Sequence, residues 1–136
     1  MADNYLHSDV TSIIIKAFYK VYTQLGYGFL EKVYQNSLLI ELRKSDFDCS
    51  PLCPIDVFYE DAKVGFYIAD IIVNNCVIIE IKAAECLCEE HEAQLTNYLR
   101  ATDIEVGILL NFGKKPEFKR KVFSKEYKNL NQSSPS

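Results

Sequence analysis

Hydrophobic side chains recur with a helical period in the first third of the chain. Within residues 8–25 the apolar positions lie three or four residues apart, which predicts an amphipathic helix. Gly26 and Gly28 follow and are expected to end this helix, because glycine adopts left-handed backbone conformations at little cost. A second helix with one apolar face is expected over residues 29–44.

The pattern then changes from the helical repeat to alternation, which predicts strands. Three strands separated by turn signals are expected over residues 55–60, 65–73 and 77–83. The helical period returns over residues 85–100, and a short, almost wholly apolar run over residues 106–110 is typical of a strand covered on both faces. The pattern leaves open whether residues 117–123 form one more strand.

The order of these elements, ααβββαβ with one further strand left open, indicates the fold class. A meander of antiparallel strands followed by a helical crossover predicts an α/β fold with a mixed β-sheet flanked by helices. The chain length of 136 residues fits one domain. We place this domain at residues 1–128 and expect the polar residues 129–136 to form a disordered tail.

The composition excludes several classes of protein. Hydrophobic residues make up 49% of the chain and charged residues 25%, which is ordinary for a folded protein and excludes disorder throughout. No apolar run approaches the roughly 18 residues of a membrane span, and the N-terminal sequence lacks the basic region of a secretory signal. The odd cysteine count, 5, indicates reduced thiols and a cytoplasmic location.

A strand that should be buried carries two charges. Glu80 and Lys82 interrupt the apolar run of residues 77–83, and because they are two residues apart they share one face of the strand. Burying either charge alone is costly, so each requires a partner, a metal ion or water. A solvated polar face would explain this pair alone. Asp70 argues against that explanation, because it interrupts the preceding apolar strand in the same way.

The position of Asp70 relative to Glu80 depends on the turn at residues 74–75. A two-residue turn would place the two carboxylates on opposite faces of the sheet. A three-residue loop pairs Val73 with Val77, and therefore Asp70 with Glu80. Asparagine, present at both turn positions, tolerates the left-handed backbone that such a loop requires. We predict the three-residue loop.

Two opposed carboxylates indicate a metal ion. They repel each other unless a cation lies between them, and oxygen ligands without histidine favour Mg²⁺ or Mn²⁺ over zinc. Asp70 and Glu80 are therefore the candidate ligands, and Lys82 would hold the attacking water or neutralise charge on a phosphate. This arrangement suits metal-assisted hydrolysis of a phosphodiester.

The charge is distributed unevenly along the chain. Residues 114–128 contain seven basic and two acidic residues, a local charge of +5, so the rest of the chain carries −9 of the total of −4. Two interpretations stay open: a solvated edge, or a positive flank that contacts phosphates beside the acidic metal site. In the second interpretation Lys119 and Lys121, which share one face of a strand, are the candidate phosphate contacts.

Several motifs together resemble a known nuclease family. Asp70 followed by residues 80–82, EIK, resembles the D…(D/E)-x-K signature of the PD-(D/E)XK nuclease superfamily, although Ala69 stands where its proline is often found. Residues 28–34, GFLEKVY, match the motif G-x-x-E-x-x-Y. The chain therefore resembles the GxxExxY family, which is classed with RecB-like nucleases. Further similar segments follow in the family's order, so the resemblance runs over residues 7–123.

The resemblance implies a restriction-endonuclease-like core and roles for further residues. In related nucleases an acidic residue on the helix before the sheet completes the metal site, and Glu31 matches it; both Glu31 and Tyr34 could then point inward. Gln94 and Tyr98 resemble the Q-x3-Y motif that positions DNA, and His91 lies three residues earlier. The alternatives are an exposed acid at a helix start and a half-buried tyrosine beside a surface amide.

These observations predict a nuclease that depends on Mg²⁺ or Mn²⁺ and hydrolyses nucleic-acid phosphodiester bonds. Asp70, Glu80 and Lys82 would be catalytic, and the expected partner is nucleic acid, with DNA favoured over RNA. The alternative is a non-catalytic module that binds nucleic acid or protein and retains the nuclease fold. A homodimer and a subunit of a larger complex are both open.

Overall fold

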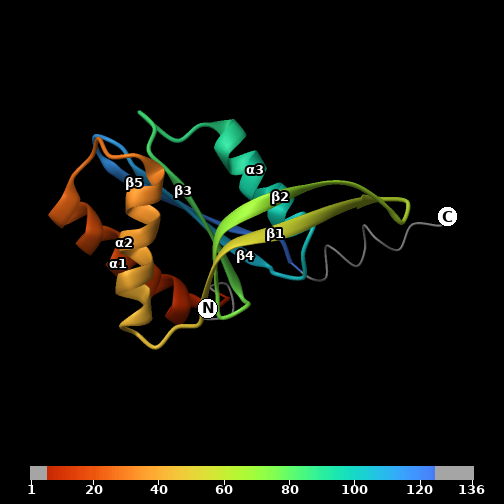
Figure 1. Ribbon diagram of the computed structural model, residues 1–136, viewed down its shortest axis with the longest axis horizontal. Coiled ribbons are helices and arrows are strands. Elements are labelled where there is room, and N and C mark those ends of the chain that lie inside the picture. Colours follow the sequence, from red (N-terminus) through yellow and green to blue (C-terminus); the bar gives the residue numbers. More distant parts are fainter. Residues whose placement is uncertain (1–5, 125–136) are drawn as a thin grey trace.

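The computed structural model describes residues 6–124, which form three helices and five strands (Figure 1). The elements in chain order are α1 (Ser8–Leu25), α2 (Glu31–Arg43), β1 (Cys49–Tyr59), β2 (Ala62–Val73), β3 (Val77–Lys82), α3 (Glu89–Arg100), β4 (Val106–Phe112) and β5 (Pro116–Val122). The predicted order is confirmed, and the strand that the pattern left open is present as β5.

The five strands form one mixed sheet in the order β1-β2-β3-β4-β5. The first three strands are antiparallel neighbours, β3 and β4 are parallel, and β5 returns antiparallel to β4. Helix α3 makes the crossover between the parallel strands. Helices α1 and α2 pack on one face of the sheet and α3 packs on the other (Figure 1). The predicted α/β fold with a mixed sheet is therefore confirmed.

Strand β3 lies at the centre of the sheet and is buried on both faces. Ile79 and Ile81 join the core cluster formed with α1 and α2, whereas Ile78 joins the cluster under α3. Because side chains alternate along a strand, Glu80 and Lys82 face α3. The charged residues of this strand therefore belong to the layer between the sheet and α3.

Strand β1 begins earlier than the sequence pattern predicts. Pro51 and Pro54 interrupt the alternation and hide its first half, yet they lie within the strand. Strand β1 is at the edge of the sheet, where proline is tolerated because one side of the backbone needs no ladder partner. Helix α3 begins at Glu89 rather than at residue 85, so the segment after β3 is longer than predicted.

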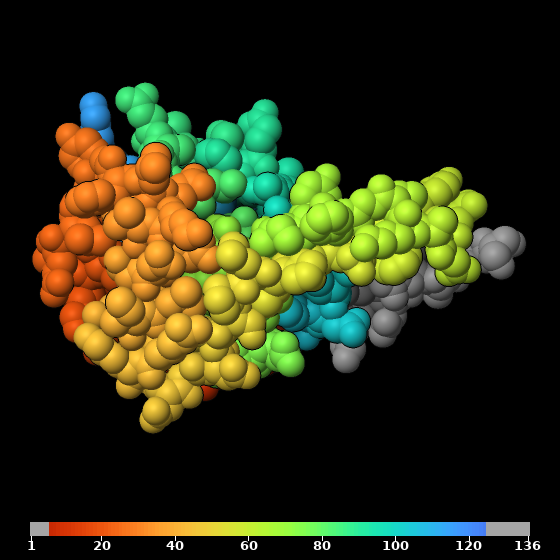
Figure 2. Space-filling view, in the orientation of Figure 1, coloured from red at the N-terminus to blue at the C-terminus, as the bar shows by residue number. Residues whose placement is uncertain are grey.

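Strands β1 and β2 extend far beyond the rest of the sheet. They pair along nearly their whole length, whereas β3 pairs only with residues Ile71, Ile72 and Val73 of β2. Residues 53–69 therefore form a hairpin, called here the arm, that projects from the body of the molecule (Figures 1 and 2). A bulge between Val57 and Phe58 interrupts its register.

The connection between α1 and α2 is fixed by one buried tyrosine. Gly26 and Gly28 have φ of 68° and 111°, which confirms that glycines in the left-handed region end α1. The hydroxyl of Tyr34 donates to the carbonyl oxygen of Gly26 at 2.7 Å and accepts from the Phe29 N–H at 3.1 Å. Its ring stacks on Phe112 of β4 with centroids 4.2 Å apart. Tyr34 therefore ties the loop before α2 to the sheet.

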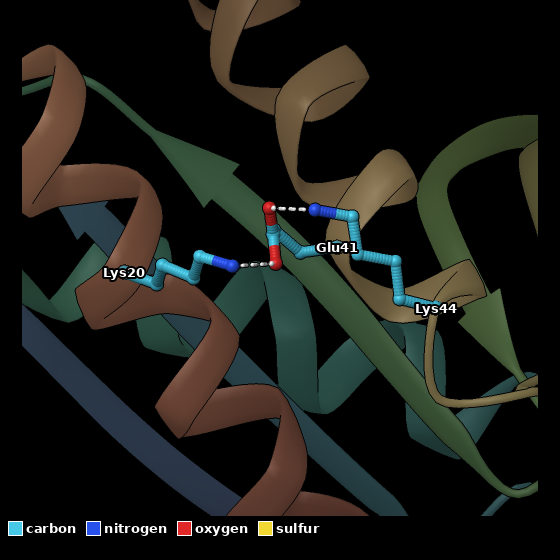
Figure 3. Close-up of polar contacts among 3 residues, drawn as sticks. All are labelled: Lys20, Glu41 and Lys44. Atoms are coloured by element: carbon cyan, nitrogen blue, oxygen red, sulfur yellow. Dashed lines mark hydrogen bonds and ion pairs between the residues drawn. The ribbon is translucent and has the colours of Figure 1, made fainter.

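A surface ion-pair cluster also joins the two helices. Lys20 of α1 and Lys44 both contact the carboxylate of Glu41 on α2, at 3.0 Å and 3.1 Å (Figure 3). These contacts lower the pKa of Glu41, with the Lys20 hydrogen bond as the largest cause. The two lysine side chains are exposed, so the pairs contribute little to stability.

All five cysteines are free thiols. Among residues 6–124, no helix is both long and apolar enough to cross a membrane. The predicted disordered tail, residues 129–136, lies outside the described residues, and the assignment of residues 1–128 to a single domain stays a prediction.

Replacing Tyr34 with phenylalanine is expected to destabilise the fold. The Gly26 carbonyl and the Phe29 N–H would each lose a partner in a half-buried loop, so the free energy of unfolding should fall by about 1–3 kcal/mol. Urea unfolding of Tyr34→Phe measures this loss. Tyr27→Phe is the matched control, because the Tyr27 side chain is 57% exposed. Equal stability of the two variants would show that Tyr34 does not fix the loop.

Candidate active site

The turn between β2 and β3 has the predicted register. Val73 pairs with Val77 and Ile71 pairs with Ile79, which confirms the three-residue loop. Asn74 and Asn75 have φ of 51° and 56°, so both adopt the left-handed conformation. In this register the next residues along the two strands are Asp70 and Glu80, and they lie opposite each other as predicted.

Asp70 and Glu80, called here the acidic pair, exchange hydrogen bonds with each other's strands. The Asp70 N–H donates to Oε2 of Glu80 at 2.9 Å, and the Ile81 N–H donates to Oδ2 of Asp70 at 2.7 Å. The β2–β3 pairing ends one residue earlier, at Ile71 and Ile79. The carboxylates therefore take the place of backbone acceptors at the point where the two strands separate.

A buried amide supports the backbone of the acidic pair from the other face of the sheet. Nε2 of Gln35 on α2 donates to the carbonyl oxygen of Asp70 at 2.9 Å. Gln35 is 9% exposed, so this contact is shielded from water. Sequence analysis missed Gln35. Its position one residue after Tyr34, on the apolar side of a helix, was the available signal.

Burial makes the acidic pair electrostatically unfavourable when both groups are charged. Glu80 is only 4% exposed. Its burial, followed by the nearby Asp70 carboxylate, raises the pKa of Glu80 to about 8. Burial also raises the pKa of Asp70, and the Ile81 N–H opposes this shift. One buried and one half-buried acid that both resist ionisation are the environment in which a cation would be most stabilising.

Lys82 is held by the helix that covers this face. Nζ of Lys82 donates to Oε1 of Gln94 on α3 at 2.8 Å. Gln94 is also hydrogen-bonded to the side chain of Tyr98, one turn later. Burial, followed by the charges of Glu80 and Asp70, raises the pKa of Tyr98 to about 12, so its hydroxyl stays protonated near the acidic pair. The structure therefore brings Lys82, Gln94 and Tyr98 together in the layer between the sheet and α3.

Glu31 is placed differently from the sequence expectation. It begins α2 and is exposed, whereas Tyr34 is fully buried, so the two side chains do not both point inward. The exposed position matches the alternative of a helix-start acid. Glu31 is nevertheless close enough to the acidic pair for its charge to raise the pKa of Asp70 and of Glu80. It lines an open pocket of about 570 Å³ together with Lys114.

His91 has a local structural role. Its Nδ1 accepts a hydrogen bond from the Cys88 N–H at 3.2 Å, and the Cys88 side chain caps the His91 backbone in return. The two residues thus form a capping box that begins α3. A contact of His91 with substrate stays a prediction.

The two candidate phosphate contacts on β5 differ in their surroundings. Lys121 forms an ion pair with Glu92 of α3, whereas Lys119 is exposed. Arg120 points to the opposite face, where it donates to the carbonyl oxygen of Leu6 at 2.6 Å. The two lysines lie on one face of β5, as predicted, but part of the positive charge is already neutralised within the protein.

Asn111 holds the segment that follows β3, a role that the sequence analysis did not assign to it. Its side chain is fully buried, and Oδ1 accepts from the Ala84 N–H at 2.8 Å. Its Nδ2 donates to the Ala84 carbonyl at 3.0 Å and to Oε1 of Glu117 at 3.2 Å. Its position as the one polar residue of strand β4 was the available signal.

The residues of the acidic pair fit an ion such as Mg²⁺, which needs only one or two protein ligands, rather than an ion that is enclosed by a full set of protein ligands. Within the part of the chain that the structure describes, no three His, Cys, Asp or Glu side chains are grouped as a complete ligand set. Mg²⁺ is usually held by one or two carboxylates together with waters and substrate phosphates. Two adjacent carboxylates of raised pKa meet this requirement, and the absence of histidine disfavours zinc.

Comparisons with known proteins agree with this arrangement. A family profile described as the PD-(D/E)XK nuclease superfamily matches residues 8–121. No curated protein sequence matches the chain. Among solved structures, the crystal structure of SSO0001 aligns with a TM-score of 0.52 and 18% sequence identity, over 76% of this chain. At this identity the similarity concerns the fold alone, and this chain spans 59% of that protein's chain.

Glu80→Gln is expected to stabilise the metal-free protein at high pH. The folded pKa of Glu80 is raised from 4.5 to about 8, so between these values the folded protein holds a proton that the unfolded chain has lost. Wild-type stability therefore falls as pH rises through this range, and the neutral amide escapes that penalty. In EDTA the melting temperature of Glu80→Gln should exceed that of wild type by about 5 °C at pH 8 and by much less at pH 5.

Glu41→Gln is the control with the opposite electrostatics. Its lysine partners lower the pKa of Glu41, so the charged form is favoured in the folded state and the amide should not raise the melting temperature at pH 8. A Glu80→Gln difference from wild type that is independent of pH would contradict the predicted ionisation of Glu80.

Proposed function

Since this chain belongs to the PD-(D/E)XK nuclease superfamily, we propose that it hydrolyses nucleic-acid phosphodiester bonds with Mg²⁺ or Mn²⁺. Within the superfamily we assign it to the GxxExxY family, on the match of residues 28–34. The observation that carries the proposal is the reciprocal bonding of Asp70 and Glu80 beside Lys82, in one buried layer. Nucleic acid is the proposed partner, with DNA favoured over RNA.

The acidic pair would hold the ion. Asp70 and Glu80 supply two negative charges, and Glu31, exposed at the start of α2, adds a third charge on the approach to them. When bound, the ion supplies positive charge that stabilises the charge developing on the scissile phosphate. Its binding would also relieve the repulsion between the two neighbouring carboxylates.

Lys82 would act on the reacting groups. The Gln94 carbonyl oxygen fixes its ammonium on the face of β3 that carries Glu80, and two N–H donors remain for a phosphate oxygen or for the attacking water. A positioned charge that needs no reorganisation during the reaction is the main way in which enzymes stabilise such transition states.

Gln94 and Tyr98 would position the substrate strand. They follow Lys82 in one hydrogen-bonded series, so a backbone contact to either side chain is transmitted to the lysine. His91 and the exposed Lys119 lie on the same side of the sheet as α3 and are secondary candidates for phosphate contact. Lys121 would first have to leave Glu92.

The rival function is a binding module that retains the fold without activity. The Lys121–Glu92 ion pair favours it, because it reduces the positive charge available to a polyanion. The rival predicts nucleic-acid binding or protein binding that is independent of Lys82. An activity assay therefore separates the two proposals.

Lys82→Ala is expected to abolish cleavage without unfolding the protein. Loss of a positioned charge at the reacting phosphate should lower the rate of Mg²⁺- or Mn²⁺-dependent cleavage on the order of 100-fold or more. Gel analysis of labelled DNA and RNA, single- and double-stranded, measures the rate. Lys44→Ala is the matched control, because that lysine is bound to Glu41 on the surface of α2. Equal cleavage by both variants would refute the role of Lys82.

Divalent ions are expected to stabilise the folded protein through the acidic pair. A ligand that binds only the folded state raises its stability by mass action, so 10 mM Mn²⁺ should raise the melting temperature by about 3 °C or more. Asp70→Asn should remove the shift. Asp61→Asn, in the turn at the tip of the arm, should retain it. A shift that persists in Asp70→Asn would place ion binding elsewhere in the protein.

A further inference from the structure

A groove separates the arm from the C-terminal half of α3. It has a volume of about 470 Å³, and its lining combines arm residues with residues of the helix. From the arm come Ile55, Val57, Phe58 and Tyr67, among others, and from α3 and its end come Asn97, Tyr98 and Arg100. None of these residues is used by the metal-binding proposal except Tyr98, which the groove shares with the candidate active site.

Two aromatic side chains of the groove are largely exposed. Tyr67 is 55% exposed and Phe58 is 61% exposed. The Tyr67 ring lies against the Tyr98 ring, with centroids 5.7 Å apart and planes inclined at 40°. The groove thus presents aromatic surfaces to an incoming ligand, and Figure 2 shows the arm that carries two of them projecting from the body.

The charge of the groove favours an anion. Arg100 is exposed at the end of α3, where its guanidinium lies 4.7 Å from the centre of the Phe123 ring. The acidic residue of the groove, Asp56, is paired with Lys63 at 3.1 Å. The positive charge of Arg100 therefore remains available beside the aromatic rings, which is the combination that binds nucleic-acid strands.

The groove is connected to the acidic pair through Tyr98. Tyr98 forms part of its lining, and on the other side Tyr98 is hydrogen-bonded to Gln94, which holds Lys82. The charges of Glu80 and Asp70 act on the Tyr98 hydroxyl, so these groups are close neighbours. A strand whose bases occupy the groove would have its backbone beside the proposed reacting groups.

We propose that this groove holds unpaired bases of a nucleic-acid strand, stacked on Tyr67 and Phe58, with Arg100 on the backbone. The substrate class of the proposed nuclease is then single-stranded nucleic acid, or a single-stranded tail on a duplex. This inference rests on the proposed function and narrows it.

A duplex does not fit the same chemistry. Its bases are paired and stacked on each other, so their faces are not available to the exposed rings of Tyr67 and Phe58. An unpaired strand gains stacking energy at each ring, and this gain is tolerant of sequence because every base has an aromatic face. The groove therefore selects for strandedness rather than for sequence.

The test is binding of labelled oligonucleotides, measured by fluorescence anisotropy with Ca²⁺ in place of Mg²⁺ to suppress cleavage. The probes are an unpaired oligo-dT, an unpaired oligo-U and a blunt DNA duplex. Wild type should bind the unpaired strands more tightly than the duplex. Tyr67→Ala should weaken binding of the unpaired strands by about tenfold. Arg100→Ala should lower the slope of log affinity against log salt by about 0.7.

Phe66→Ala is the matched control. Phe66 precedes Tyr67, is similarly exposed at 57%, and points to the opposite face of the arm. Its replacement should leave oligonucleotide affinity unchanged. Because both aromatic residues are exposed, neither variant should disturb the fold, and circular dichroism checks this.

Three results would overturn the inference. The first is equal affinity of Tyr67→Ala, Phe66→Ala and wild type for unpaired strands, and the second is tighter binding of the blunt duplex. The third is a self-association of the protein that Tyr67→Ala abolishes while oligonucleotide affinity stays the same, which would make a second copy the occupant. Cleavage in Mg²⁺ is scored separately: binding through Tyr67 without cleavage would refute the proposed function alone, and duplex cleavage unaffected by Tyr67→Ala would refute the inference alone.

Discussion

The hydrogen bonds that the Asp70 and Glu80 carboxylates each accept from the backbone of the neighbouring strand are the constraint on which the rest of the structure depends. Each carboxylate occupies the acceptor position of a sheet ladder, which satisfies backbone N–H groups that would otherwise be buried without a partner. Strands β2 and β3 can therefore separate at this point without an energetic penalty at the ladder. Strand β3 continues beside β4 in the core, and β2 continues with β1 into the arm (Figure 1).

The same arrangement keeps electrostatic strain at the centre of the sheet. The Asp70 N–H and Lys82 favour the ionised form of Glu80, but burial and the Asp70 charge outweigh them and the pKa of Glu80 remains raised. Among residues 6–124, no basic side chain forms an ion pair with either acid: Lys82 donates to Gln94 instead. The charged pair lowers the stability of the fold. Such a site is suited to binding a cation, because the positive charge offsets the repulsion between the carboxylates.

The sequence predicts the parts of this site that depend on the alternation of side chains along a strand and on the backbone preferences of turn residues. Strand alternation places Glu80 and Lys82 on one face, and two asparagines with a left-handed preference select the register that brings Asp70 opposite Glu80. The orientation of Glu31 follows from packing, because Tyr34 takes the buried position on α2. Gln35 escapes prediction because its helical position indicates burial but does not identify the Asp70 carbonyl as its partner, and edge prolines conceal the first half of β1.

Separation of β2 from β3 also links the acidic pair to the arm. Beyond the point where β2 separates from β3, only part of β2 packs under α3. There Tyr67 contacts the last turn of the helix, at Tyr98. Tyr98 is in turn one hydrogen bond from Gln94, which positions Lys82. A ligand that stacks on Tyr67 therefore contacts the series of side chains that orients the proposed catalytic lysine. The separation of β2 from β3 thus forms both the acidic pair and the groove beside it. The proposed strand binding and the proposed cleavage would therefore depend on the same structural feature.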